Sequence, residues 1–419
     1  MNTKLALSHV TLLAGAFVAA LTLTTTVPHD FAFFSGGYRL DVFVNSAASA
    51  ATLGAIVAVV IATVVSRTRS AGAAAGFGIV LLAVVSLVQP AGQLQLRALA
   101  AGLILGGVVA LTGMRERRTL QCALVVGVVS ATAMAGPLES EGISARYADY
   151  LEPDAPQTYL LVALGVFAVL LAVSAWARAF EGQPAPVDEK RRVLLVGVVI
   201  PVAGLMLYWL FQRSVASLGT GDAMQNRWLL GLAVIPLLVG AAFALPTATG
   251  AVVLAALAYL GAGSSTGSFE MSTALVFVAL LLVGTVAGWR WRSPMIGFAL
   301  LAVVAATGLF TDPPLDWINL GANAFVLPFA VGLLYTSLLP TIAPAATMSV
   351  TTPIAVSIPI VAEFGWTAYT PLTTIEPTFS PTAWTWTSTA VSVGSVLAAG
   401  AAFAVLQRRS GNSPTNLKG

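Results

Sequence analysis

The feature that most constrains this chain is a succession of apolar runs, each close to the length of a membrane-spanning helix. About 20 mostly apolar residues are needed to cross roughly 30 Å of hydrocarbon. Backbone groups in lipid must also satisfy one another, which predicts helices for these runs. The runs give 14 candidate spans: 7–27, 44–66, 73–90, 95–113, 119–137, 158–178, 193–211, 228–245, 248–263, 271–288, 294–310, 323–339, 343–362 and 385–406. Several are short, so the range is 12–14, with 248–263 and 343–362 the doubtful members.

Composition excludes the alternatives to a membrane protein. Of the 419 residues 58% are hydrophobic and only 9% are charged, whereas a soluble domain carries about 25% charged residues. So few charges cannot cover a water-exposed surface, and disorder needs the opposite composition. We therefore expect an all-α, polytopic protein whose main partner is the lipid bilayer.

The charges are sorted by side of the membrane, which gives an orientation. With the N-terminus inside, 15 of the 20 Lys and Arg residues and only four of the 17 acidic residues fall in inner segments. Basic loops are retained in the cytoplasm. This predicts an even number of spans in the plasma (inner) membrane with both termini cytoplasmic, and a first span retained as a helix rather than cleaved as a signal peptide. It also explains the net charge of +3 without a nucleic-acid partner.

The best domain boundary is the polar inner segment 181–192. We expect a first six-helix bundle in 1–180, a linker with two extra spans in 181–246, a second six-helix bundle in 247–407 and a cytoplasmic tail in 408–419.

A short repeat marks corresponding places in the two bundles. Arg67-Thr68-Arg69-Ser70 lies between the second and third spans, and Gly76-Phe77 follows it. Arg290-Trp291-Arg292-Ser293 lies between the second and third spans of the last six, and Gly297-Phe298 follows it. Duplicated halves are a common plan of secondary transporters.

This arrangement resembles the major facilitator superfamily, and in particular its 14-span drug:proton antiporter branch, in which two extra helices separate two six-helix bundles. Arg97 with Gly102 and Gly106 lies in the fourth span, where that branch has an arginine and a glycine-containing helix. The stretch from Gly127 to Gly136-Pro137 is similar to the Gly-Pro ending of the fifth span in the branch. The family's Gly-x-x-x-Asp-Arg pattern is not present around Arg67.

The resemblance implies alternating access with gates formed by the inner loops and by closely packed helices. The candidates for gating and packing are Arg67, Arg69, Gly102, Gly106, Gly136, Pro137, Arg290, Arg292 and Pro353. Pro353 belongs to the proline-rich run 343–362, where irregular backbone can survive at membrane depth only if it is buried or faces a cavity. That run is either a broken helix lining the pathway or an ordinary short span.

Four charged residues are the candidates for substrate binding or ion coupling. Arg97 is the one charge clearly within a span, where a guanidinium pairs, lines a cavity or extends to the membrane surface. Asp41, Glu270 and Glu363 lie at outer span edges, where partial burial would suit proton coupling. Asp41 and Glu270 are equally consistent with acids placed at helix N-termini.

Signatures of catalysis and of metal binding are not found in the sequence. The chain has two histidines, His9 and His29, and a single cysteine, Cys122, which predicts no metal site and no intramolecular disulfide. No GxxxxGK[ST] loop is present either. We expect no enzyme activity and no cofactor.

Two functions remain open at this stage. The first is a secondary transporter that exports a small amphipathic or lipophilic solute by alternating access, with protons as the coupling ion that the resemblance implies. The second is a non-transporting helical subunit or scaffold of an envelope or secretion complex. Two matching bundles would favour the transporter.

Overall fold

The structure is a computed structural model that describes residues 3–25, 47–90, 92–112, 117–140, 158–180, 190–216, 232–262, 269–311, 314–339, 381 and 383–411. Helices are the only regular secondary structure in these residues. Eight helices are long and apolar enough to cross a membrane within this described part, and shorter apolar helices accompany them. The expected all-α, multi-pass membrane protein is confirmed.

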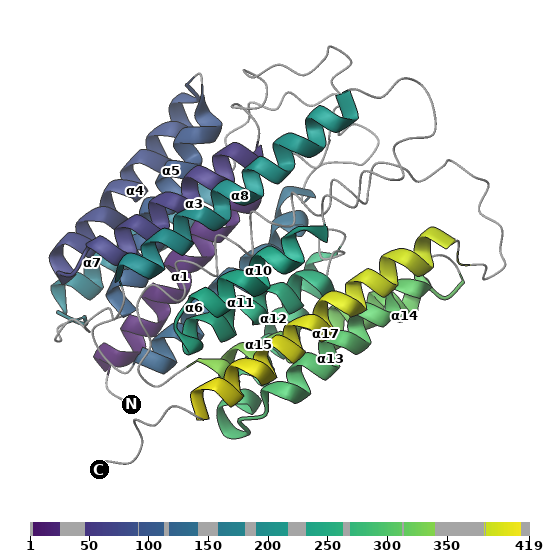
Figure 1. Cartoon of the computed structure of the whole chain (residues 1–419). Coiled ribbons are helices and arrows are strands. Elements are labelled where there is room, and N and C mark those ends of the chain that lie inside the picture. Colours follow the sequence, from purple (N-terminus) through teal and green to yellow (C-terminus); the bar gives the residue numbers. More distant parts are fainter. Residues whose placement is uncertain are drawn as a thin grey trace.

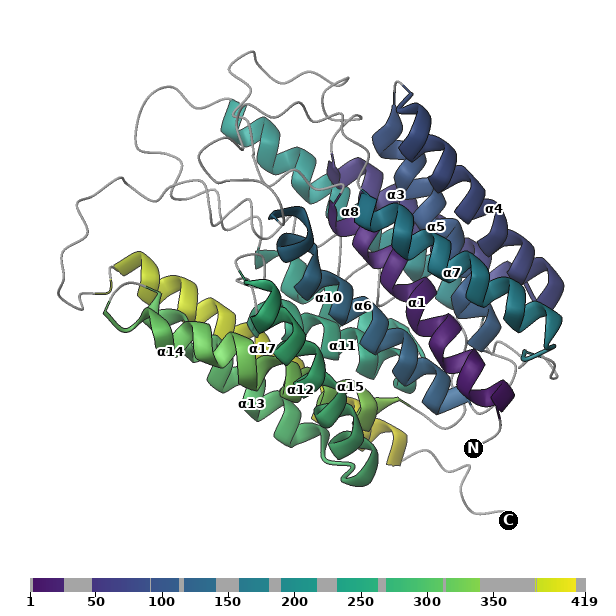
Figure 2. The same ribbon diagram turned by 180° about the vertical axis from the view of Figure 1, so that it is seen from behind.

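The helices form two groups that lie side by side (Figures 1 and 2). The first group comprises α1 (Thr3–Thr25), α3 (Ala47–Val64), α4 (Thr68–Val88), α5 (Gln93–Thr112), α6 (Arg117–Ser140), α7 (Thr158–Trp176) and α8 (Lys190–Ala216). The second comprises α10 (Val234–Ala244), α11 (Thr247–Ala262), α12 (Met271–Arg290), α13 (Pro294–Ala306), η4 (Thr307–Phe310), α14 (Asp316–Gly321), η5 (Ala322–Val326), α15 (Leu327–Leu338) and α17 (Ala383–Gly411).

Most predicted spans coincide with these helices, because the length of an apolar run sets the length of a span. One differs in its bounds, and two lie partly or wholly outside the described residues. Residues 228–231 of the predicted span 228–245 are not described, and the described helix α10 has 11 residues, about 16 Å at 1.5 Å per residue. The predicted span 323–339 starts earlier, at Asp316, and contains the π-helical turn η5. The predicted span 343–362 lies outside the described residues.

Helix α4 has a lipid-facing side of large apolar residues and a buried side that includes several small ones. In α4 the exposed side is lined by Phe77, Val80, Val84 and Leu87, while its buried residues include Ala71, Ala75 and Gly78. This distribution of side chains has a physical cause. Lipid is as apolar as leucine, so burying a large apolar side chain gains little, and helices in lipid associate by close packing of small residues. The exposed side of α4 is therefore its lipid-facing side.

The helix pairs of the first group recur in the second. Helix α5 packs on α1, α3 and α4, and α15 packs on α11, α12 and α13. Helix α7 packs on α1 and α4, and α17 packs on α11 and α13. If α1, α3, α4, α5 and α7 are matched in order with α11, α12, α13, α15 and α17, all five contacts correspond. These five helix contacts are therefore made in both groups.

Both ends of the described chain lie on one side (Figure 1). Helix α1 begins beside the end of α7, where Ser8 Oγ donates to the carbonyl of Ala179 at 3.2 Å. Helix α17 ends beside α10, where the Arg409 guanidinium lies 4.9 Å from the ring centroid of Phe243. We call this side the basic end, because Lys4, Arg178 and Arg409 lie there.

Candidate functional site

The two helix groups meet along α6, and this contact is the candidate functional site. Helix α6 packs on α1 within its own group and on α12 and α15 across the groups. Further along α6, the hydroxyl oxygens of Thr132 and Tyr259 are 3.3 Å apart, which joins α6 to α11. A single helix therefore carries the polar links between the groups that the described residues make here.

Arg118 supplies the strongest polar link across this contact. It lies in the first turn of α6, is only 7% exposed, and its Nη2 donates to the Thr336 carbonyl in α15 at 2.9 Å. Cys122, one turn further along α6, has its Sγ 4.0 Å from Oγ1 of the same threonine. The start of α6 is thus tied to the end of α15.

Local sequence explains why a basic side chain bonds there. The last four carbonyls of an α-helix have no donor within the helix, and the C-terminus carries partial negative charge. Thr336 is two residues from the end of α15, so its carbonyl is one of these groups. The Arg118 guanidinium donates a hydrogen bond to this carbonyl, and its positive charge also interacts favourably with the partial negative charge of the helix C-terminus. Arg292, in the turn after α12, is close enough to Arg118 for their charges to interact, which adds a second cation at the basic end.

Sequence reasoning missed this role of Arg118. The residue counted only as one of three inner arginines between the fourth and fifth spans. The available signal was its position at the first turn of a span, where a basic side chain can reach the C-terminus of a neighbouring helix. The partner, a backbone carbonyl in a distant helix, leaves no mark in the sequence.

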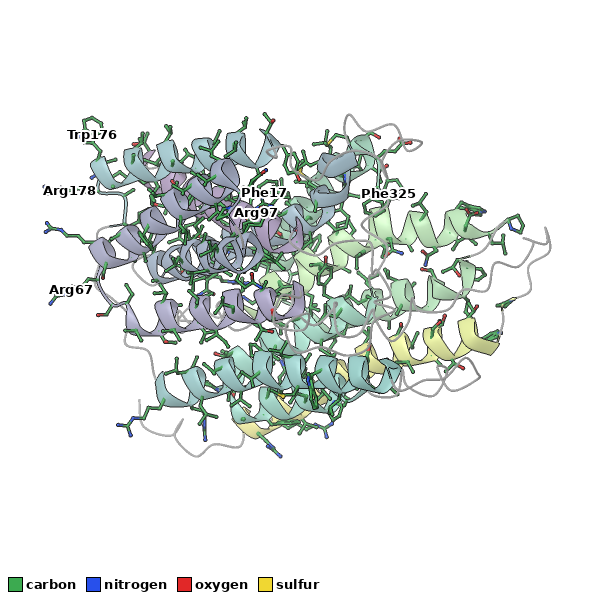
Figure 3. All side chains as sticks on the ribbon, turned by 90° about the horizontal axis from the view of Figure 1, so that it is seen from above. Phe17, Arg67, Arg97, Trp176, Arg178 and Phe325 are labelled. Atoms are coloured by element: carbon green, nitrogen blue, oxygen red, sulfur yellow. The ribbon has the colours of Figure 1, made fainter. Side chains whose placement is uncertain are left out.

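Arg97, the candidate within a span, lies in the second turn of α5, at the end opposite the basic end. Figure 3 shows it among the helices of the first group, whereas Arg67, Trp176 and Arg178 project from one end of that group. Its Nε is buried without a hydrogen-bond partner, and the ionisable side chain that interacts with it electrostatically is Tyr159 of α7. Within the described residues no carboxylate pairs with it. Its role in substrate binding or coupling stays a prediction.

Gly102 and Gly106 allow close contact between α3 and α5. A Cβ on Gly102 would meet the Gly54 carbonyl, and one on Gly106 would meet the Ala58 carbonyl at 2.8 Å. The matching pair α12 and α15 is packed in the same way: Gly284 and Gly288 lie against the carbonyls of Phe329 and Leu333. In both groups glycines bring two parallel helices into backbone contact.

The loop arginines and Glu270 are placed at the surface. Four exposed arginines lie at or beside the turns between α3 and α4 and between α12 and α13: Arg67 and Arg292 in the turns, Arg69 in the first turn of α4 and Arg290 at the end of α12. Glu270 is the N-cap of α12, is exposed and makes no side-chain cap hydrogen bond. The arginines lie near the ends of helices, and Glu270 lies at a helix start. The gating role of the arginines and the coupling role of Glu270 stay predictions.

Two predicted residues lie on α6, and three lie outside the described residues. Pro137 falls inside α6, which continues to Ser140 instead of ending at the Gly136-Pro137 pair. A proline this close to a helix end removes only one hydrogen bond, so the helix can continue. Asp41, Glu363 and Pro353 lie in parts of the chain that the structure does not describe.

No group of three His, Cys, Asp or Glu side chains in the described residues could hold a metal ion. The buried polar side chains at the contact along α6 include Arg118, Gln121 and Thr336, which offer a guanidinium, an amide and a hydroxyl group.

No protein-family model matches the chain, and no curated protein matches it either. Among solved structures, the chain is similar to the crystal structure of a Major Facilitator Superfamily (MFS) transporter, FucP, in the outward conformation. That similarity covers 95% of this chain and 98% of the other, with 15% sequence identity and a TM-score of 0.46.

Proposed function

We propose that this protein is a secondary transporter that moves a small solute across the membrane by alternating access. In this proposal the two helix groups are the moving bodies. The observation that carries the proposal is the recurrence of the same helix pairs, with the same glycine-mediated contacts, in both groups. Transporters built from repeats place their binding site between the repeats and rock one against the other.

The contact between the groups supports this mechanism. At the basic end, the Arg118–Thr336 hydrogen bond connects α6 to α15 and closes that side. One hydrogen bond to a carbonyl is strong enough to favour a closed state and weak enough to break during a transport cycle.

The finer features come from the resemblance to the 14-span drug:proton antiporter branch. They are export, an amphipathic or lipophilic solute and coupling to a proton gradient. Arg97, buried in part and without a carboxylate partner among the described residues, is the proposed contact for an anionic or polar group of the solute. Of the acids proposed for proton coupling, only Glu270 lies in the described residues, and it is exposed at a helix start.

A reversible cross-link between the groups tests the proposal. In Thr336→Cys, the new thiol faces the native Cys122, whose Sγ is 4.0 Å from Thr336 Oγ1. A disulfide of about 2 Å requires only a small approach. The assay is efflux of ethidium and of a panel of other lipophilic dyes from cells that express the chain.

Alternating access predicts that oxidation stops dye efflux in Thr336→Cys and that reduction restores it. Thr336→Ser keeps the hydroxyl and is the matched control, which should respond to neither treatment. The proposal fails if no dye leaves faster than from cells carrying an empty vector, or if the oxidised protein transports as fast as the reduced one.

A further inference from the structure

Two arginines from different helix groups lie near each other at the basic end. Arg118 lies in the first turn of α6 and Arg292 follows α12, and their charges are close enough to interact. Arg118 is buried, and although its Nη2 bonds the Thr336 carbonyl, its Nε has no hydrogen-bond partner. The contact between the groups therefore holds two like charges together.

The described residues supply no anion that could compensate these two charges. Their acidic residues lie at the starts or ends of helices on the side opposite the basic end: Glu139 in α6, Glu270 before α12 and Asp316 in α14. A buried guanidinium without a counter-charge is costly, and a second cation beside it raises the cost. An anion from outside the described residues would remove this cost.

The end of α12 and the turn after it have the side chains that suit a phospholipid headgroup. The sequence there is Trp289-Arg290-Trp291-Arg292, and all four residues are exposed. Tryptophan is enriched at the level of lipid headgroups, because its ring is apolar and its N–H is polar. Arginine binds phosphate through paired N–H donors. We call this segment the Trp-Arg turn.

The corresponding turn of the first group lacks the tryptophans. Its sequence is Ser66-Arg67-Thr68-Arg69, with the two arginines at the same places in the repeat. Positive charge, which keeps a loop in the cytoplasm, is present in both turns. Of the two, only the turn beside Arg118 has aromatic residues, so retention of the loop does not explain them.

An apolar ridge of α12 leads to the Trp-Arg turn. Leu275, Leu282, Val286 and Trp289 are exposed, and their spacings of seven, four and three residues place them on one side of the helix. Like the exposed side of α4, this side faces lipid. The ridge favours a lipid over a free phosphate ion, because only the lipid can also contact the apolar side chains.

We propose that the Trp-Arg turn binds the phosphate of an anionic phospholipid in the leaflet at the basic end. Arg290 and Arg292 donate to the phosphate oxygens, and Trp291 lies at the level of the headgroup. The net negative charge of the bound lipid compensates Arg118 and Arg292, so the lipid favours the closed contact between the helix groups. Its effect on transport rests on the proposed function, whereas lipid binding does not.

The test measures alkylation of Cys122 by N-ethylmaleimide in the full-length protein in lipid nanodiscs. Cys122 is the single cysteine of the chain and lies at the contact, so a faster reaction reports a more open contact. The reagent is uncharged, and membrane charge does not concentrate it. Phosphatidylglycerol, which has a net negative charge, replaces part of the phosphatidylcholine, which has a phosphate but no net charge. We expect phosphatidylglycerol to slow alkylation several-fold in a saturable way, and an unchanged rate would overturn the proposal.

Variants separate this proposal from a structural role of the turn. Arg292→Gln and Trp291→Ala should lose most of the effect of phosphatidylglycerol. In phosphatidylcholine alone, Arg292→Gln should react more slowly than the wild type, because the repulsion with Arg118 is gone. A faster reaction would show that Arg292 merely stabilises the contact and would refute the proposal. Arg408→Gln is the matched control, because Arg408 is an exposed cation in the last turn of α17, and it should keep the full effect.

Native mass spectrometry of the purified protein measures lipid binding directly. The wild type should retain phosphatidylglycerol in preference to phosphatidylcholine, and Arg292→Gln should lose this preference. Equal retention of both lipids by the wild type would contradict a site for an anionic headgroup.

Two other sources of the anion are outcomes of the alkylation experiment. Inorganic phosphate added to phosphatidylcholine nanodiscs should not slow the reaction, and protection equal to that by phosphatidylglycerol would mean that a soluble anion binds instead. Glu116, two residues before Arg118, lies outside the described residues. If Glu116→Gln accelerates alkylation while phosphatidylglycerol leaves the wild type unchanged, this acid is the partner and the proposal is wrong.

Alkylation does not depend on transport, so the two proposals can fail separately. Protection by phosphatidylglycerol without dye efflux would leave the lipid site and remove the transporter. Dye efflux with an alkylation rate that does not depend on phosphatidylglycerol would do the reverse.

Discussion

Replacing Arg118 by alanine should open the contact between the helix groups at the basic end. The lost interaction is a 2.9 Å hydrogen bond from a guanidinium that is 7% exposed, so solvent screens it little. Hydrogen bonds to charged groups contribute about 1.5–3 kcal/mol. At about 1.4 kcal/mol per tenfold change in an equilibrium constant, the ratio of open to closed protein should rise about 10- to 150-fold.

The native cysteine reports this change without further engineering. Cys122 is the single cysteine of the chain and lies one helical turn from Arg118, half-buried at the same contact. When opening is fast relative to alkylation, the rate of reaction with N-ethylmaleimide follows the population of the open state. We expect labelling to accelerate by about the factor given by the lost hydrogen bond.

Arg191→Ala is the control, because Arg191 is a basic residue exposed in the first turn of α8 and is not among the gating candidates. It should label at the wild-type rate. The reasoning is refuted if Arg118→Ala lowers the unfolding temperature while Cys122 reacts at an unchanged rate. The hydrogen bond would then stabilise a static contact and not a gate.

Three further outcomes are expected. Gly102→Ala should destabilise the protein by about 1–3 kcal/mol because the added Cβ would meet the Gly54 carbonyl. Gly332→Ala should have a similar effect, because its Cβ would meet the Leu281 carbonyl. Both losses are measured by unfolding in detergent. Gly76→Ala, with nothing within 4 Å of its Cβ, should be neutral or stabilising by up to about 1 kcal/mol, and a loss like that of Gly102→Ala would contradict the packing argument. Arg97→Ala should slow dye efflux at least tenfold without lowering the unfolding temperature, since no carboxylate of the described residues is left unpaired; unchanged efflux would exclude Arg97 from the pathway.

The sequence was sufficient to locate the spans but not to show which spans pack against each other. The run 271–288 predicted α12 to within two residues, because hydrocarbon thickness fixes where an apolar run must end. The same uniform hydrophobicity hides which face of a helix packs inside, since lipid and protein interior are equally apolar. Glycine positions carry that information, and Gly102 and Gly106 lie at the close contact between α3 and α5.

The polar sites show a different limit. Arg97 was identified because a charge within a span is conspicuous. The closeness of Arg118 and Arg292 was not, because the two residues belong to different helix groups and lie far apart in the sequence. The role of Arg118 was likewise invisible, because its partner is a main-chain carbonyl 218 positions away in the chain.

The two extra helices are attached to different helix groups. Helix α8 packs on α3 of the first group, whereas α10 is joined to α11 through the short link Leu245-Pro246 and touches α17. Helices α8 and α10 also contact each other. If the two groups rock against each other as proposed, each extra helix would move with its own group, and the contact between α8 and α10 would have to slide.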